Sequence, residues 1–276
     1  MSPSTPVAAP TWPPVGPTGI APGAADLAER VRQLSATASI EYWKLGTEEE
    51  GLDFSEIAFV AETLSDGLPV FVKIGGPCAR ADMRQAAGVG ARGLLAPMIE
   101  SAFALRRFVE GSEDVLGAAA FAPGPGYVRR GINLETGTAY AVLDALLAEP
   151  AAARLDFFNV GRSDLASSLG VRVESAHMTD VVRDIGRRVR ATGRPIFVGG
   201  AVTSATLAPL FAVQAIDGFQ TRFLAFRCEG VRHVDETVRL ALEVEVALLH
   251  VLAERFPARA DEHLRRAHVV AGRLAV

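Results

Sequence analysis

The chain contains only two cysteines, Cys78 and Cys228, among its 276 residues. Two widely separated thiols cannot build a disulfide framework, and they lack the spacing of a thiolate metal site. Isolated cysteines of this kind are typical of proteins from a reducing compartment. We therefore expect a cytoplasmic protein.

Long apolar runs and an excess of basic residues are both missing as well. No stretch approaches the roughly 20 consecutive apolar residues of a membrane helix, so we expect no membrane association. The formal net charge is -4 and no basic stripe is present, which argues against a nucleic-acid partner. Residues 1–23 are rich in Pro, Gly, Ala and Thr and lack the basic and apolar regions of a signal peptide. This segment is predicted to be a disordered or loosely attached arm.

Apolar, strand-like runs alternate with helical periodicity along the rest of the chain. Seven runs are predicted to be strands, at residues 39–45, 68–76, 93–98, 131–136, 155–161, 194–202 and 217–226. Strands that are apolar on both faces and separated by helices are typical of a parallel sheet covered by helices.

This rhythm predicts an α/β fold, a closed (β/α)8 TIM barrel over residues 24–234. The eighth strand is expected either at residues 115–121 or within the N-terminal arm. An open doubly wound sheet is the alternative architecture. Residues 235–276 are predicted to form helices that pack on the barrel or on a neighbouring subunit, and they favour a homo-oligomer.

Two acidic residues follow strands in successive βα units. In a parallel barrel the carboxyl ends of the strands meet at one face, so Glu135 and Asp164 are expected to approach each other there. Two carboxylates with no nearby cysteine or histidine form a hard oxygen site that suits Mg2+ or Mn2+. The structural alternative is that Asp164 caps the following helix and Glu135 pairs with an arginine.

Two stretches carry recognisable motifs. Residues 132–170 contain Leu-Glu-Thr and Gly-Arg-Ser-Asp-Leu, and residues 71–111 contain Lys-Ile-Gly-Gly and Ala-Pro-Met-Ile-Glu. Both stretches resemble the HpcH/HpaI aldolase and citrate lyase β-subunit family. The resemblance spans roughly residues 40–226. It implies that Glu135 and Asp164 hold a divalent metal, which chelates a 2-oxo acid such as pyruvate or oxaloacetate and stabilises its enolate. The predicted function is a metal-dependent carbon–carbon lyase or aldolase, with an aldehyde as the second small-molecule partner.

The sequence departs from this family in two places. Lys73 stands where the aldolases carry an arginine that gathers the substrate carboxylate, and a lysine lacks the bidentate fork of a guanidinium. The early loop at residues 46–51, Gly-Thr-Glu-Glu-Glu-Gly, has no histidine for acid–base chemistry. We expect Glu49 or a neighbouring residue to transfer protons, with His177 as a second candidate.

Further residues are expected to complete the substrate site. Arg222 is predicted to lie inside the last strand, either binding an anionic group at the barrel mouth or forming a buried ion pair. Substrate contacts are expected from Gly75, Gly76, Met98, Glu100 and Arg162. The glycine pair would offer backbone N–H groups to a carboxylate or phosphate.

Two other functions stay open at this level. One is a CoA-thioester lyase, like the malyl-CoA and citramalyl-CoA cleaving relatives. Four arginines could then contact the CoA phosphates: Arg106, Arg107, Arg129 and Arg130. The other is a catalytically altered barrel that binds a sugar or keto acid as a regulatory or scaffolding subunit. The missing histidine and Lys73 motivate that second possibility.

Overall fold

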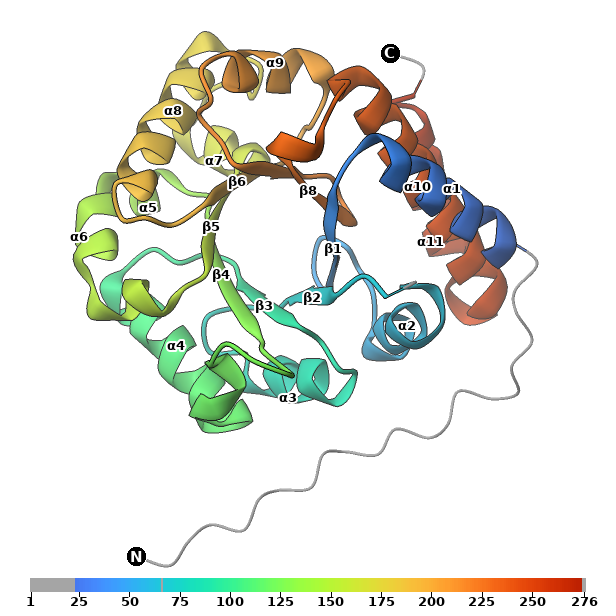
Figure 1. Ribbon diagram of the computed structural model, residues 1–276, viewed down its shortest axis with the longest axis horizontal. Helices are drawn as coiled ribbons and strands as arrows, with labels where there is room; N and C mark the ends of the chain where they lie inside the picture. Colours follow the sequence, from blue (N-terminus) through green and yellow to red (C-terminus); the bar gives the residue numbers. More distant parts are fainter. Residues whose placement is uncertain (1–22, 66, 275–276) are drawn as a thin grey trace, which may run out of the picture.

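The computed structural model describes residues 23–65 and 67–274. Eight strands close into a barrel in the order in which they occur along the chain, and helices surround it (Figure 1). The strands are β1 (Ile40–Gly46), β2 (Val70–Lys73), β3 (Gly93–Ala96), β4 (Arg129–Leu134), β5 (Phe157–Gly161), β6 (Ile196–Gly199), β7 (Gly218–Gln220) and β8 (Leu224–Arg227). The closed ring confirms the predicted α/β barrel and excludes the open sheet.

Helices follow most of the strands and cover the outside of the barrel. They are α1 (Ala24–Thr37), α2 (Phe54–Phe59), α3 (Arg80–Gly88), α4 (Ala102–Leu116), α5 (Gly137–Ala141), α6 (Leu143–Ala148), α7 (Arg162–Leu169), α8 (Ala176–Arg190), α9 (Ser204–Ala212), α10 (Val234–Arg255) and α11 (Ala260–Ala271). The C-terminal helix α10 packs between α1 and α11 on the barrel exterior and also touches α9 (Figure 1). Among the helices of residues 23–65 and 67–274, none is long and apolar enough to cross a bilayer.

The last part of the barrel differs from the sequence prediction. Residues 217–226 do not form one strand: β7 and β8 are joined by a tight turn and pair in an antiparallel sense, with Phe219 opposite Phe226. Strand β8 is also antiparallel to β1, whereas the other neighbouring strands are parallel. Arg222 therefore lies in the turn and not inside a strand.

The prediction of the eighth strand at residues 115–121 is wrong. Residues 115–121 form the end of α4 and a 3-10 turn at Ala118–Phe121, which Gly117 separates with a φ of 83°. The ring is completed by β8 instead. The alternative location, in the N-terminal arm, falls outside the described residues.

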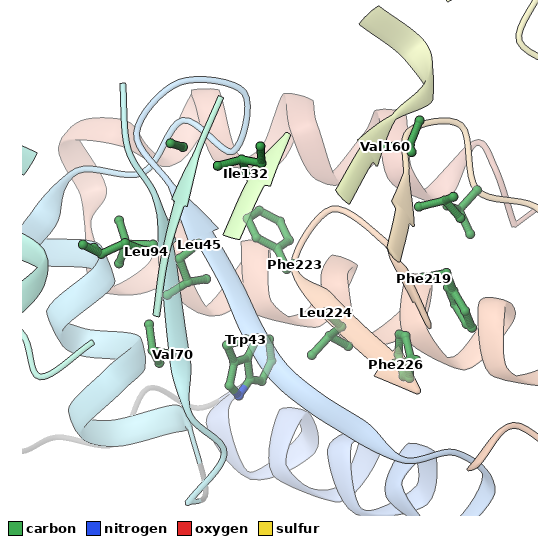
Figure 2. Close-up of a cluster of buried hydrophobic side chains, with 14 of the residues drawn as sticks. Trp43, Leu45, Val70, Leu94, Ile132, Val160, Phe219, Phe223, Leu224 and Phe226 are labelled. Carbon is green, nitrogen blue, oxygen red and sulfur yellow. The ribbon is translucent and has the colours of Figure 1, made fainter. Parts of the chain in front are cut away.

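Outward-facing side chains of the strands form the main hydrophobic core between barrel and helices. Figure 2 shows Trp43, Leu45 and Val70 from the first two strands together with Phe219 and Phe226 from the last two. Because the side chains of a strand alternate, the residues between these point into the barrel. The apolar runs recognised in the sequence thus serve two separate cores.

Four inward-facing rings form an aromatic plug inside the barrel, namely Tyr42, Phe71, Phe157 and Phe197. Tyr42 stacks on Phe71 with ring centroids 3.9 Å apart, and Phe157 meets Phe197 edge to face at 5.5 Å. Glycines stand opposite three of these rings on the neighbouring strand, in the pairs Phe71–Gly93, Phe157–Gly131 and Phe197–Gly218. A Cβ on any of the three glycines would lie within 2.4 Å of a ring atom. The glycines are thus required because the rings occupy the space of their side chains.

This packing predicts a large cost for a single methyl group. Gly131→Ala would place its Cβ 2.2 Å from the Phe157 ring, so we expect a loss of unfolding free energy of about 1–3 kcal/mol or more from overpacking. Urea unfolding measures this loss. Gly76→Ala is the matched control, because nothing lies within 4 Å of its added Cβ. Equal stability of the two variants would contradict the packing argument.

Candidate active site

A cleft of about 150 Å³ opens at the carboxyl ends of the parallel strands. This is the face of an α/β barrel on which active sites are built. Its carboxylates are Glu49, Glu50, Glu135 and Asp164, and its cationic side chains are Lys44, Lys73, Arg222 and Arg273. Buried amide side chains from β4, β5 and β7 form its floor, namely Asn133, Asn159 and Gln220.

Glu135 directly follows β4 and is almost fully buried, at 2% exposed. One carboxylate oxygen accepts a hydrogen bond from the Met98 backbone N–H at 2.9 Å, and the other accepts from the Asn133 amide at 2.8 Å. Burial raises the pKa of this carboxyl above its usual range; Lys73 opposes the rise, and the charge of Asp164 adds to it. The two hydrogen bonds therefore fix the orientation of the carboxylate, and the nearby Lys73 does not fully offset the effect of burial on its pKa.

Gly161 ends β5 and explains how Glu135 and Asp164 come to share the cleft. A Cβ at Gly161 would lie 2.6 Å from Oε2 of Glu135, so only glycine leaves room for that carboxylate. Asp164 follows in the first turn of α7, whose start has no side-chain cap. In the part of the chain that the structure describes, Asp164 forms no hydrogen bond or ion pair with a side chain. Asp164 does not cap α7, and the hydrogen-bond partners of Glu135 are Met98 and Asn133, not an arginine. The structure therefore does not support the alternative of a helix cap and an arginine pair.

Lys73 ends β2 and lies between the two acidic sides of the cleft. It is 8% exposed, and its ammonium group opposes the burial-driven rise of the Glu135 pKa and helps Lys44 to lower the pKa of Glu50. Register places it beside Gly46 of β1, in the layer above the aromatic plug. A cation at this place can neutralise negative charge that a bound anion brings into the cleft.

Lys44 and Glu50 line the cleft as well, and Glu50 is one of the neighbours of Glu49 that the sequence left open for proton transfer. Lys44 points into the barrel from β1 and pairs with Glu50 at 2.5 Å. Of the two neighbouring glutamates, the predicted Glu49 is exposed and Glu50 is buried. The run of three glutamates signalled an acidic loop, but no local signal distinguishes which member turns inward.

Arg222 and Arg273 line the outer part of the cleft. Arg222, in the β7–β8 turn, donates to the backbone carbonyl of Glu49 at 2.5 Å. Arg273 comes from the end of the C-terminal helical segment, more than a hundred residues from the other lining residues of β4 and β5. Nothing in the local sequence around Arg273 indicates this position.

Arg162 lies behind the cleft wall and not in the cleft. Its buried guanidinium donates to the carbonyl oxygens of Gly199, Gly200 and Ala201, at 3.4, 2.7 and 3.2 Å. Burial lowers the pKa of this guanidinium to about 10. Arg162 therefore shapes the β6–α9 loop, which is itself part of the cleft wall.

Other predicted residues are not brought into the cleft. Gly75 donates its N–H to Asp82, a Cβ added at Gly76 would meet nothing within 4 Å, and neither glycine lines the cleft. Glu100 and His177 are exposed and lie outside the lining. Met98 contributes its backbone N–H to Glu135 while its side chain is exposed.

The donor set of the cleft fits a hard divalent cation. No group of three or more His, Cys, Asp or Glu side chains suited to a metal occurs within the described ranges. Glu135 and Asp164 offer oxygen ligands, and each Glu135 oxygen keeps a free lone pair beside its one hydrogen bond. Mg2+ is typically held by one or two carboxylates and completed by water and substrate. Glu135 and Asp164 are the residues that could hold such an ion.

The fold and the cleft together define an α/β barrel with an acidic and cationic pocket at the carboxyl ends of its strands. Solved structures with this barrel include an HpcH/HpaI aldolase from Desulfitobacterium hafniense, at 20% identity and a TM-score of 0.55 over 69% of this chain and 78% of that one. An HpcH/HpaI aldolase/citrate lyase family protein from Burkholderia cenocepacia matches at 17% identity and 0.54, covering 70% and 82%. The citrate synthase SbnG matches at 16% and 0.54, covering 71% and 82%.

These neighbours confirm the resemblance at the level of the barrel fold. No family model and no curated protein matches the chain. A shared fold does not by itself define an activity, so the chemistry has to be argued from the cleft.

Proposed function

We propose that the chain is a divalent-metal-dependent carbon–carbon lyase that acts on a 2-oxo acid. The observation that carries this proposal is that Glu135 and Asp164 line one cleft together with the buried Lys73. The charge of Asp164 is felt by Glu135, whose pKa it helps to raise. The same barrel fold occurs in HpcH/HpaI aldolases, and with it this reaction class is proposed by analogy.

Each residue of the cleft has a role in this reaction. Glu135 and Asp164 would hold Mg2+ or Mn2+, which when bound supplies Lewis-acid polarisation of the 2-oxo group. The Lys73 ammonium would offset negative charge that develops on the substrate. Arg222, at the rim, would bind the substrate carboxylate or a second anionic group.

Asp164→Asn tests the metal site. We expect its Mn2+ affinity, measured by isothermal titration calorimetry, to fall at least about 100-fold, beyond the loss seen for outer-shell partners of a metal. The fold should be unaffected because Asp164 has no side-chain partner in the described ranges. Asp180→Asn, an exposed aspartate on α8, is the control. Unchanged Mn2+ affinity in Asp164→Asn would contradict the site.

The reaction class is tested by product formation. Pyruvate released from 4-hydroxy-2-oxo acids in the presence of Mg2+ would support the lyase. Release of acetyl-CoA from a hydroxyacyl-CoA thioester would point to the CoA-dependent alternative. Metal binding without turnover on either class would favour a ligand-binding barrel.

A further inference from the structure

The carboxylate of Glu50 lies at the barrel mouth, in the loop between β1 and α2. The residue is only 1% exposed, yet it lines the same cleft as Glu135 and Asp164. A buried carboxylate is costly unless it is paired or has a use. Neither metal binding nor anion binding in the proposed site employs it.

Two lysines hold Glu50 in its ionised form. Oε1 accepts from the Lys44 ammonium at 2.5 Å, and Lys73 approaches from the neighbouring strand. Burial by itself would raise the pKa of the Glu50 carboxyl, but the two ammonium groups outweigh it and keep that pKa below its ordinary value. The group is therefore available as a base.

The second oxygen of Glu50 is left without a partner. Oε2 is buried and forms no hydrogen bond within the described residues. Gly46 makes room for it, because a Cβ there would lie 2.5 Å from Oε2. An unsatisfied buried acceptor beside a ligand cleft is free to receive a proton from a bound molecule.

The loop that carries Glu50 is clamped from the C-terminal segment. Arg266 of α11 donates to the backbone carbonyls of Glu50 and Gly51, at 2.9 and 2.7 Å. Arg259 donates to Gly51 as well, at 2.6 Å. Gly51 has a φ of 59°, and a Cβ there would overlap the Arg266 guanidinium. Precise placement of this kind is what proton transfer requires.

We propose that the Glu50 carboxylate is the base and acid that moves the proton at the carbon next to the 2-oxo group. This inference rests on the proposed function. The C–H bond breaks, its electron pair becomes the C=C bond of the enolate, and the 2-oxo oxygen takes the negative charge. The proton goes to Oε2 of Glu50. In the reverse direction the same proton returns to carbon, so no further reactant is needed.

Hydrogen exchange at the methyl group of pyruvate tests this step directly. The protein with Mg2+ and pyruvate in D2O should replace methyl protons by deuterium, followed by 1H NMR. We expect Glu50→Gln to slow this exchange by about 100-fold or more, the usual range for loss of a general base. Mn2+ binding should be retained, because Glu135 and Asp164 are unchanged.

Two further variants make the test selective. Glu48→Gln, an exposed glutamate of the same loop outside the cleft lining, should exchange at the rate of the unaltered protein. Glu50→Asp keeps the charge that pairs with Lys44 but withdraws the carboxylate by one methylene. It should fold even where Glu50→Gln does not, and it should also slow exchange.

The outcomes separate this inference from the function on which it rests. Rapid exchange in the unaltered protein with no slowing in Glu50→Gln or Glu50→Asp would overturn the role of Glu50 alone. Loss of exchange in Glu49→Gln with normal exchange in Glu50→Gln would transfer the role to Glu49. Absence of metal-dependent exchange from the unaltered protein would overturn both proposals.

Discussion

Glu135→Gln is expected to abolish divalent-cation binding and to lower turnover by about 1000-fold or more, at or beyond the loss for a group that stabilises developing charge. The amide has the size of the carboxylate and its oxygen can still accept from the Met98 N–H, so the fold should persist although the hydrogen bond from the Asn133 amide is lost. What is lost is an anionic oxygen facing Asp164. Steady-state kinetics and Mn2+ titration measure the two effects, with exposed Glu110→Gln on α4 as the control.

The pH dependence of metal binding gives an independent check of the same residue. Burial raises the pKa of the Glu135 carboxyl above its ordinary value of 4.5, so protons compete with the metal at higher pH than for an ordinary glutamate. Metal affinity should therefore fall as the pH drops through that raised pKa. The assignment of Glu135 as a metal ligand would be refuted if metal affinity followed the pKa of an ordinary glutamate. Full metal binding by Glu135→Gln would refute it as well.

Glu56→Ala is expected to lower the unfolding free energy by about 3–5 kcal/mol, the cost of breaking a buried pair by removing one partner. Glu56 is fully buried and joins α2 to α11: it contacts His263 at 2.6 Å and the Arg259 guanidinium. It also accepts from the Asp53 N–H at 2.9 Å in a capping box. Urea unfolding measures the loss.

The same variant links stability to the active site. Arg259 also holds the Gly51 carbonyl, so loosening α11 should weaken the clamp on the Glu50 loop. Glu62→Ala, an exposed glutamate in the next turn of the same helical segment, is the control. A loss below about 1 kcal/mol for Glu56→Ala would place it among ordinary surface changes and would contradict a buried network.

The barrel could be predicted because its strands carry a strong local signal. Continuous apolar runs such as residues 155–161 serve an outer and an inner core at once, and helical periodicity separates them. The β7–β8 hairpin was missed because its turn, Thr221-Arg222-Phe223, has no Gly, Pro, Asn or Asp to mark a reversal. Its two short strands therefore merge into one apolar run.

The candidate site divides along a similar line. Glu135 and Asp164 could be proposed because strand ends of successive βα units necessarily share a face of the barrel, and they line one cleft. Arg162 was expected at the same face for the same reason. Its side chain turns instead to the β6–α9 carbonyls, because a guanidinium that is buried needs several acceptors.

Local patterns of side chains specify the rhythm of strands and helices, and with it which acidic residues stand at strand ends. Both Glu49 and Glu50 line the cleft, and tertiary contacts set which of the two is buried there. That choice depends on Lys44, Lys73 and Arg266, which lie on three different elements. The contact from Arg266 spans more than two hundred positions, and it leaves no periodic trace because it arises only when the C-terminal helices pack against the closed ring.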